Sequence, residues 1–216
     1  MIRRWSWALL GLLAVPTAVR AQALEDYDYE NLSFRGIGLE YGRIWPTKVE
    51  PAGVYALKAD LGYLGPGVRI LPSLSYWSSA MDADELGRLA TQLSRLGAPV
   101  TAEDLGRIEW RDISLAVDGQ YVFEPGAGVQ PYLGVGAGLH VFDGRGAAVE
   151  GTFIEDLLDS VTAGLNAVAG IELAPAEQVR IGVEGRYTLL DDIRYPEVRI
   201  GASFVLPARG AAGGVQ

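Results

Sequence analysis

The stretch that most constrains the fold is residues 130–142, QPYLGVGAGLHVF, in which two kinds of side chain alternate without a break. One set is continuously apolar, from Leu133 to Val141. The other set is small or polar, with glycines between Tyr132 and His140. Successive side chains of a β-strand point to opposite faces. The pattern therefore predicts a strand with one apolar face and one small or polar face.

The same alternation recurs along the chain and predicts an all-β domain of about eight strands. The high content of turn residues, Gly 28 and Pro 11, is typical of many strands joined by turns. Pro72 falls inside one strand, where its missing N–H predicts a bulge or a local distortion. The expected strands cover 33–45, 54–64, 68–78, 109–123, 130–142, 161–173, 179–189 and 195–206.

Two long connections interrupt the strand pattern. In residues 79–106 leucines recur at helical spacing, with Asp82 or Asp84 as a cap, and a second helix start is expected at Thr101. In residues 143–160 a helical turn is expected at 153–158. These loops predict short helices outside the sheet. Packing on the domain's own rim and a role as a lid or partner-binding element both remain open for the first loop.

The N-terminus has the features of a secretory signal peptide. Arg3 and Arg4 precede an apolar run that is followed by Pro16 and small residues, which predicts cleavage after Ala21 or Ala23. The run is too short for a membrane-spanning helix, which needs about 20 apolar residues. The expected organisation is a signal peptide at 1–21, a lead-in at 24–32, a barrel at 33–206 and a flexible tail at 207–216.

Composition excludes several classes of function. With Cys 0, the chain has no disulfide, thiol nucleophile or lipoprotein anchor cysteine. The formal net charge is −9, and loss of Arg3, Arg4 and Arg20 with the signal peptide (18 − 3 = 15 basic against 27 acidic residues) makes it −12. This acidity argues against nucleic acid as a partner. No phosphate-binding or metal-ligand spacing is recognisable, so we expect no cofactor and no metal.

Alternation alone does not say which face of the sheet is inside. A soluble lipocalin-like barrel buries its apolar face, whereas a transmembrane barrel turns that face to lipid. Three features favour the transmembrane barrel: short and long connections alternate, the polar face is rich in glycine and in charges of both signs, and aromatic residues gather near the strand ends. Closure would also pair every backbone group, as lipid requires.

In this pattern and topology, the chain resembles the small outer-membrane β-barrel family of OmpA-transmembrane-domain and OmpX type. The resemblance covers residues 33–206 and includes the last strand, VRIGASF, which ends on the aromatic Phe204. It implies a closed, antiparallel, up-and-down, porin-like barrel with short helices in its long external loops. It also implies the bacterial outer membrane as the location, with the surrounding lipid as a partner.

The polar faces of the strands are expected to line the lumen. With about eight strands the interior is just wide enough for side chains to fill, so we expect a plug of mutual salt bridges and no open pore. The lumen candidates are Glu40, Lys58, Asp60, Arg69, Asp112, Asp118, His140, Glu172, Glu184, Arg186 and Arg199.

The function expected from this sequence is a structural or interaction role through the external loops, as a monomer that contacts an external protein or surface ligand. A narrow channel or a small-ligand-binding barrel, including a soluble lipocalin-like one, is the alternative. A lipid A-modifying hydrolase or acyltransferase would need His140, the single histidine, as general base, with a serine such as Ser114 or Ser203. Because no serine has a spacing that resembles those enzymes, an enzyme is not expected.

Overall fold

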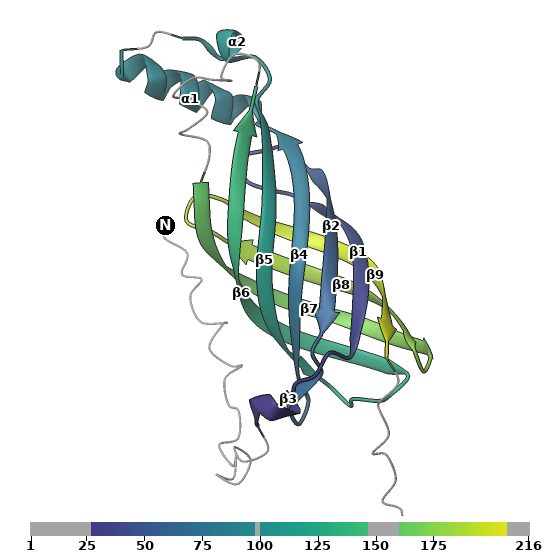
Figure 1. The fold of residues 1–216 in the computed structure, drawn as a ribbon. Coiled ribbons are helices and arrows are strands. Elements are labelled where there is room, and N and C mark those ends of the chain that lie inside the picture. The colour runs from purple at the N-terminus through teal and green to yellow at the C-terminus, as the bar shows by residue number, and fades with distance from the viewer. Residues whose placement is uncertain (1–26, 98–99, 147–159, 207–216) are drawn as a thin grey trace, which may run out of the picture.

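The computed structural model describes residues 27–97, 100–146 and 160–206. Their strands form one antiparallel sheet, and pairing of β2 with β4 closes it into a barrel (Figure 1). Because β2 and β3 together fill one place in the wall, the barrel is the eight-stranded one expected. The strands are β1 (Gly36–Ile44), β2 (Ala52–Asp60), β3 (Tyr63–Gly65), β4 (Val68–Ala80), β5 (Glu109–Val122), β6 (Val129–Arg145), β7 (Ser160–Ala176), β8 (Val179–Leu189) and β9 (Arg194–Val205).

The place in the wall that β2 and β3 share is interrupted, although the sequence predicts one strand there. Gly62 has a φ of +80°, a conformation that favours glycine, and its amide donates to Asp60 Oδ1 over 2.7 Å. On the facing strand β4, the backbone of Ile70 still forms hydrogen bonds to this part of the wall. Pro72, two residues further along β4, faces the same neighbour but has no N–H to donate. The β4–β5 register runs unbroken through Pro72, so the predicted distortion lies on the β2 side.

The apolar set of each strand faces outward. On β6, Val135 is 70% exposed whereas His140 is 3% exposed, and the neighbouring strands follow the same rule. An apolar surface of this extent is stable against lipid and would be a liability in water. The soluble lipocalin-like alternative is therefore wrong, because it requires the apolar set to point inward.

The two ends of the barrel differ. Short turns join the strands at the end where β1 begins and β9 finishes, and the opposite end carries the longer loops (Figure 1). In outer-membrane barrels the short turns are periplasmic and the long loops external, so we name the two ends accordingly. At the external end β7 extends beyond β8, because the β7–β8 register stops at Leu165–Leu189 while the β6–β7 register continues to Phe142–Ser160.

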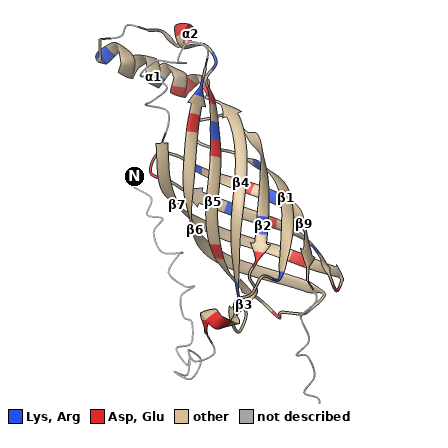
Figure 2. Cartoon of the chain, in the orientation of Figure 1, with Lys and Arg blue, Asp and Glu red and all other residues tan. Residues whose placement is uncertain are grey.

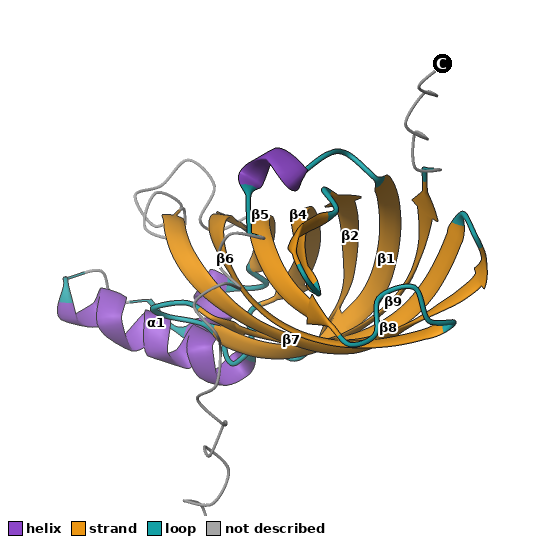
Figure 3. Cartoon of the chain, turned by 90° about the horizontal axis from the view of Figure 1, so that it is seen from below, coloured by secondary structure: helices purple, strands orange, loops and turns teal. Residues whose placement is uncertain are grey.

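The external loop between β4 and β5 folds into two helices, as the leucine spacing predicts. They are α1 (Ala83–Arg95), capped by Asp82, and α2 (Ala102–Leu105), which begins with a capping box at Thr101. The helices share a small core in which Leu93, Leu105 and Ile108 are buried. Helix α1 projects past the wall on the side of β6 and β7 (Figure 3).

Three other predictions lie outside the described residues: the signal peptide, the helical turn at 153–158 and the tail at 207–216. The described part of the lead-in contains one short 3-10 helix, η2 (Tyr29–Asn31). Within the residues that the structure describes, no helix combines the length and the apolar character needed to cross a membrane.

Candidate functional site: the interior of the barrel

The middle of the lumen is organised around Arg186 on β8. Its guanidinium pairs with both carboxylate oxygens of Asp118 on β5, and it also lies 3.0 Å from Glu184 Oε1 and 3.3 Å from Glu197 Oε1. A planar guanidinium can contact several carboxylates in fixed directions, which a lysine ammonium cannot do. One arginine therefore joins three acidic side chains from three strands.

Two further cations extend this cluster across the lumen. Lys58 Nζ lies 2.7 Å from Glu40 Oε1 and 2.7 Å from Glu184 Oε2, so it bridges β1 and β8. Arg199 lies 2.9 Å from Glu197 Oε1 and 3.5 Å from Glu40 Oε2. The contacts form a closed ring of alternating charge, in which each ion has partners from at least two directions.

Towards the periplasmic end, Arg69 is the centre of a second group. It donates two bonds of 2.8 Å to the Glu172 carboxylate and one of 2.9 Å to Gln120 Oε1. Asp60 lies 3.9 Å from Arg69 and 3.2 Å from Arg180. Gln120 also donates to Glu184 over 3.4 Å, which connects this group to the ring above it.

These contacts fill the lumen. Asp118 is fully buried and Arg69 is 1% exposed, although both carry full charges. Ions are stable at such burial only when they are paired and hydrogen-bonded. Figure 2 shows basic and acidic positions interspersed along the strands. In the part of the barrel that the structure describes, the geometry supports a packed interior in which opposite charges are paired.

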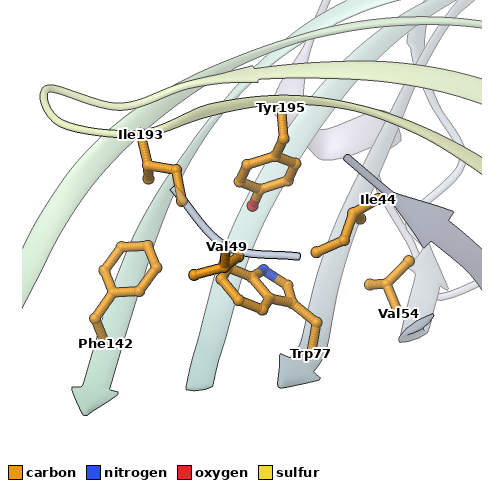
Figure 4. Close-up of a cluster of buried hydrophobic side chains, with 7 residues drawn as sticks. All are labelled: Ile44, Val49, Val54, Trp77, Phe142, Ile193 and Tyr195. Atoms are coloured by element: carbon orange, nitrogen blue, oxygen red, sulfur yellow. The ribbon is translucent and has the colours of Figure 1, made fainter. Parts of the chain in front are cut away.

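The external end of the lumen is closed differently, by an apolar cluster (Figure 4). The rings of Phe142 and Tyr195 meet Trp77 at centroid distances of 6.1 and 6.0 Å, in the edge-on arrangement that aromatic pairs favour. Val49 and Ile193 come from the connections between strands and are buried in the same cluster. The members are Ile44, Val49, Val54, Trp77, Phe142, Ile193 and Tyr195.

A polar pair that is separate from the ion-pair network lies beside this cluster. His140 Nδ1 is 2.8 Å from Asp112 Oδ2, and the imidazole stacks on Phe142 with centroids 6.1 Å apart. Within the described part of the chain, His140 Nε2 has no hydrogen-bond partner. The Ser114 hydroxyl bonds to Ser75 over 2.6 Å, and Ser203 lies on β9 opposite Gly38 of β1.

All lumen candidates from the sequence lie on the inner side of the wall. The structure brings most of them into the ion-pair network and leaves Asp112 and His140 apart as a separate pair. It adds the network members Gln120, Tyr132, Arg180 and Glu197, of which Tyr132 donates to Glu184 over 2.9 Å. Each of these occupies a polar position of its strand, so alternation alone could have identified them. Among the described residues, no group of His, Asp or Glu is arranged to hold a metal ion.

Several solved structures are similar to this chain, and one of them supports the fold described above. The crystal structure of Neisserial surface protein A superimposes with a TM-score of 0.55 at 13% identity, over 81% of this chain and 99% of that one. The attachment invasion locus protein Ail of Yersinia pestis gives 0.47 at 15%, over 81% and 99%, and the N-terminal β-barrel domain of Pseudomonas aeruginosa OprF gives 0.46 at 16%, over 81% and 99%.

No curated protein matches the chain in sequence. The family model described as "Outer membrane protein beta-barrel domain" matches residues 7–205, which is most of the chain. A closed barrel with an apolar outer face is the architecture that this family requires. The chain therefore belongs to the outer membrane protein β-barrel domain family, and with it to the bacterial outer membrane.

Proposed function

We propose that this barrel is a closed membrane anchor that presents α1 and α2 outside the cell for contact with an external protein or surface ligand. The observation that carries the proposal is the filled lumen. Paired charges close its middle and periplasmic part, and the apolar cluster closes its external end. With the lumen occupied by its own side chains, the external surface is the part available to a partner.

The external helices supply a surface of defined shape. Helix α1 is held by its Asp82 cap and by the core that it shares with α2, so its outer face has a fixed orientation. That face is exposed and carries Asp84, Arg88 and Arg95, with Arg88 donating to Glu85 over 2.8 Å. Charged side chains on a rigid element favour specific recognition over loose adhesion.

A non-enzymatic, monomeric role is part of the same proposal. Asp112 and His140 have the mutual geometry of two members of a catalytic triad. However, the neighbouring Ser114 hydroxyl is bonded to Ser75, and all of these groups are buried below the rings of the external cluster. Because His140 Nε2 has no hydrogen-bond partner among the described residues, no serine is placed for activation by this histidine, which supports binding over hydrolysis.

The proposal is tested by separating the barrel from its helices. Replacing residues 83–106 with a short Gly-Ser turn should leave a barrel that still migrates faster on SDS gels when unboiled. Proteoliposomes carrying the wild-type chain should bind to members of a panel of immobilised extracellular proteins and polysaccharides, and those carrying the variant should not. In planar bilayers, neither protein should produce conductance steps.

A point variant refines this test. Arg88→Glu together with Arg95→Glu reverses the basic charge of the α1 face without touching the wall, whereas Arg145→Glu is a control at the exposed end of β6. Binding that falls with the α1 pair and survives in the control supports recognition by α1. Stable conductance by the wild type, or equal binding after removal of the helices, would contradict the proposal.

A further inference from the structure

Two pockets meet at the external end of β7. The first, here called the outer groove, has a volume of about 620 Å³ and lies on the lipid-facing side. The second, here called the external pocket, has about 520 Å³ and lies between α1 and the hairpin that joins β8 to β9. Both are bordered by Leu190 and Asp191 of that hairpin. The outer groove is lined by Leu139, Ala163 and Leu165 among others, and the external pocket by Glu85, Leu89 and Thr162 among others.

The two pockets adjoin because the wall is notched at this point. Residues 160–164 of β7 are in register with β6, but the register with β8 begins only at Leu165. Beyond the last β7–β8 pair the chain forms the Leu190–Ile193 turn instead of continuing β8. This turn is closed by a 3.0 Å hydrogen bond from the Leu190 amide to the Ile193 carbonyl. Leu190 is half-buried and shared by both pockets, so its side chain forms the partition between them.

A buried polar atom faces this partition from inside the barrel. A Cβ added at Gly164 would lie 2.8 Å from Leu190 Cδ2 and 3.2 Å from His140 Nε2, so both atoms border the inner face of Gly164. His140 is almost fully buried, and Nε2 is unpaired among the described residues. A buried hydrogen-bonding atom without a partner is destabilising, and a ligand atom at the notch would relieve this cost.

The surrounding groups define the chemistry of a ligand. When Nδ1 of a neutral His140 imidazole donates to the Asp112 carboxylate, the Nε2 lone pair is left for a hydrogen-bond donor. The external pocket brings Glu85, Asp191 and Asp192 together with Lys48, whose ammonium lies 3.7 Å from Glu85 and 3.9 Å from Asp192. With more carboxylates than cations, this pocket disfavours an anionic head group. At the buried Nε2 atom a neutral hydroxyl can donate without the desolvation cost that a charged ammonium would incur.

We propose that the notch between β7 and the β8–β9 hairpin binds a single-chain, neutral, hydroxylated lipid taken from the surrounding membrane. The acyl chain lies in the outer groove, and the head passes Leu190 so that its hydroxyl donates to His140 Nε2. The membrane is the source because the outer groove opens on the lipid-facing side of the wall. The site does not depend on the role proposed for the external helices.

A second apolar groove, of about 710 Å³, serves as an internal comparison. It lies on the lipid-facing side of β1, β2 and β9, and the β1–β2 and β1–β9 registers run through it without a break. The groove is lined by outward side chains such as Leu39 and Ala202. It is ordinary lipid-facing surface, and no selective binding is expected there.

The single histidine makes a direct test possible. Mature protein purified without a histidine tag is labelled with ¹⁵N-histidine and placed in phosphatidylcholine nanodiscs, and 1-monoolein is titrated in. We expect a saturable upfield shift of the Nε2 resonance, because the lone pair accepts a hydrogen bond. Methyl oleate, which has a similar chain and no donor, should leave the resonance in place.

Matched variants test where the acyl chain of the lipid binds. Ala163→Trp fills the outer groove, and Ala202→Trp fills the second groove at an equally outward-facing alanine. The first should weaken the monoolein response at least tenfold, and the second should leave it unchanged. If Ala163→Trp loses the heat-dependent gel shift of a folded barrel, the monoolein response is measured in Gly164→Ala instead. The added methyl group occupies the space next to Nε2, so the response should also weaken in this variant. No response to monoolein, an equal response to methyl oleate, or an unchanged response in the deciding variant would overturn the proposal.

Discussion

The two parts of the lumen are closed by opposite kinds of chemistry. Around Arg186 the interior consists of ion pairs, in which side chains from different strands neutralise one another. At the external end, Trp77 and its neighbours fill the same cross-section with rings and aliphatic groups. In the first part, each charge depends on a specific partner. In the second, stability depends on filled volume, and partners are interchangeable if their size is kept.

The difference follows from where the side chains originate. The paired charges all stand on strands, at positions whose direction is fixed by alternation, so their contacts are set by register. The external cluster combines strand residues with Val49 and Ile193 from loops, which can approach from outside and cover the end of the lumen. Ion pairs therefore fill the part that loops cannot reach, and apolar side chains fill the part that they can.

Removing the central cation should have the largest effect. Arg186→Met keeps much of the side-chain volume but leaves Asp118, Glu184 and Glu197 without their shared partner. Breaking a buried ion pair from one side typically costs 3–5 kcal/mol, so we expect about 5 kcal/mol here. Urea unfolding in lipid vesicles, followed by tryptophan fluorescence, measures this loss of unfolding free energy.

The control is Arg180→Met at the periplasmic rim of the same network. The Arg180 side chain is 18% exposed, and its pairs with Asp60 and Glu172 span 3.2 and 4.0 Å. Because Arg180 is more exposed than Arg186 and has fewer close carboxylate partners, this variant should lose clearly less unfolding free energy than Arg186→Met. Equal losses in both variants would mean that side-chain volume matters more than pairing, and the contrast between the two parts would fail.

The external part should respond to volume. Trp77→Ala removes the ring that Phe142 and Tyr195 contact, and large-to-small changes of buried tryptophan cost about 3–5 kcal/mol. We expect about 4 kcal/mol in the same urea assay. Trp45→Ala is the control, because Trp45 is exposed on the outer face and its removal opens no internal cavity. A loss as large in the control would show that interfacial anchoring, and not packing, is the source.

The sequence predicts the faces of the barrel better than its contacts. Period-two alternation is a local property, so the inward positions of Lys58, Asp118 and Glu184 follow from the strand to which each belongs. Their partners do not follow, because Lys58 and Glu184 are far apart in the chain and meet only after the barrel closes. Likewise, the overhang of β7 depends on where pairing with β8 stops, which no local pattern encodes.

The same limit applies to the separate Asp112–His140 pair. Both residues occupy polar positions, and the sequence groups them with the other lumen charges. Their separation arises because the external cluster, partly built from loop residues, fills the lumen beside them. Loop residues such as Ile193 follow no strand period, so their inward placement could not be predicted.

The smallest expected effect concerns a carboxylate outside the wall, which provides a reference for those inside. Asp104 in α2 accepts the Thr101 hydroxyl over 2.7 Å and the Thr101 amide over 2.8 Å, and these bonds hold its pKa below the ordinary value of 3.8. A depressed pKa means that the cap is fully present above the ordinary value and is lost as the pH falls through the folded pKa.

We therefore expect Thr101→Val, which removes the hydroxyl and keeps the amide, to raise the Asp104 pKa towards 3.8. A titration of the carboxyl ¹³C resonance measures the change, and the heat-dependent gel shift of the barrel should stay unaltered. The bonds at Asp104 come from neutral donors in one exposed turn, so their loss should loosen α2 alone. A Thr101→Val chain whose barrel also lost its gel shift would show that the external helices stabilise the wall, and the interior could no longer be treated as independent of them.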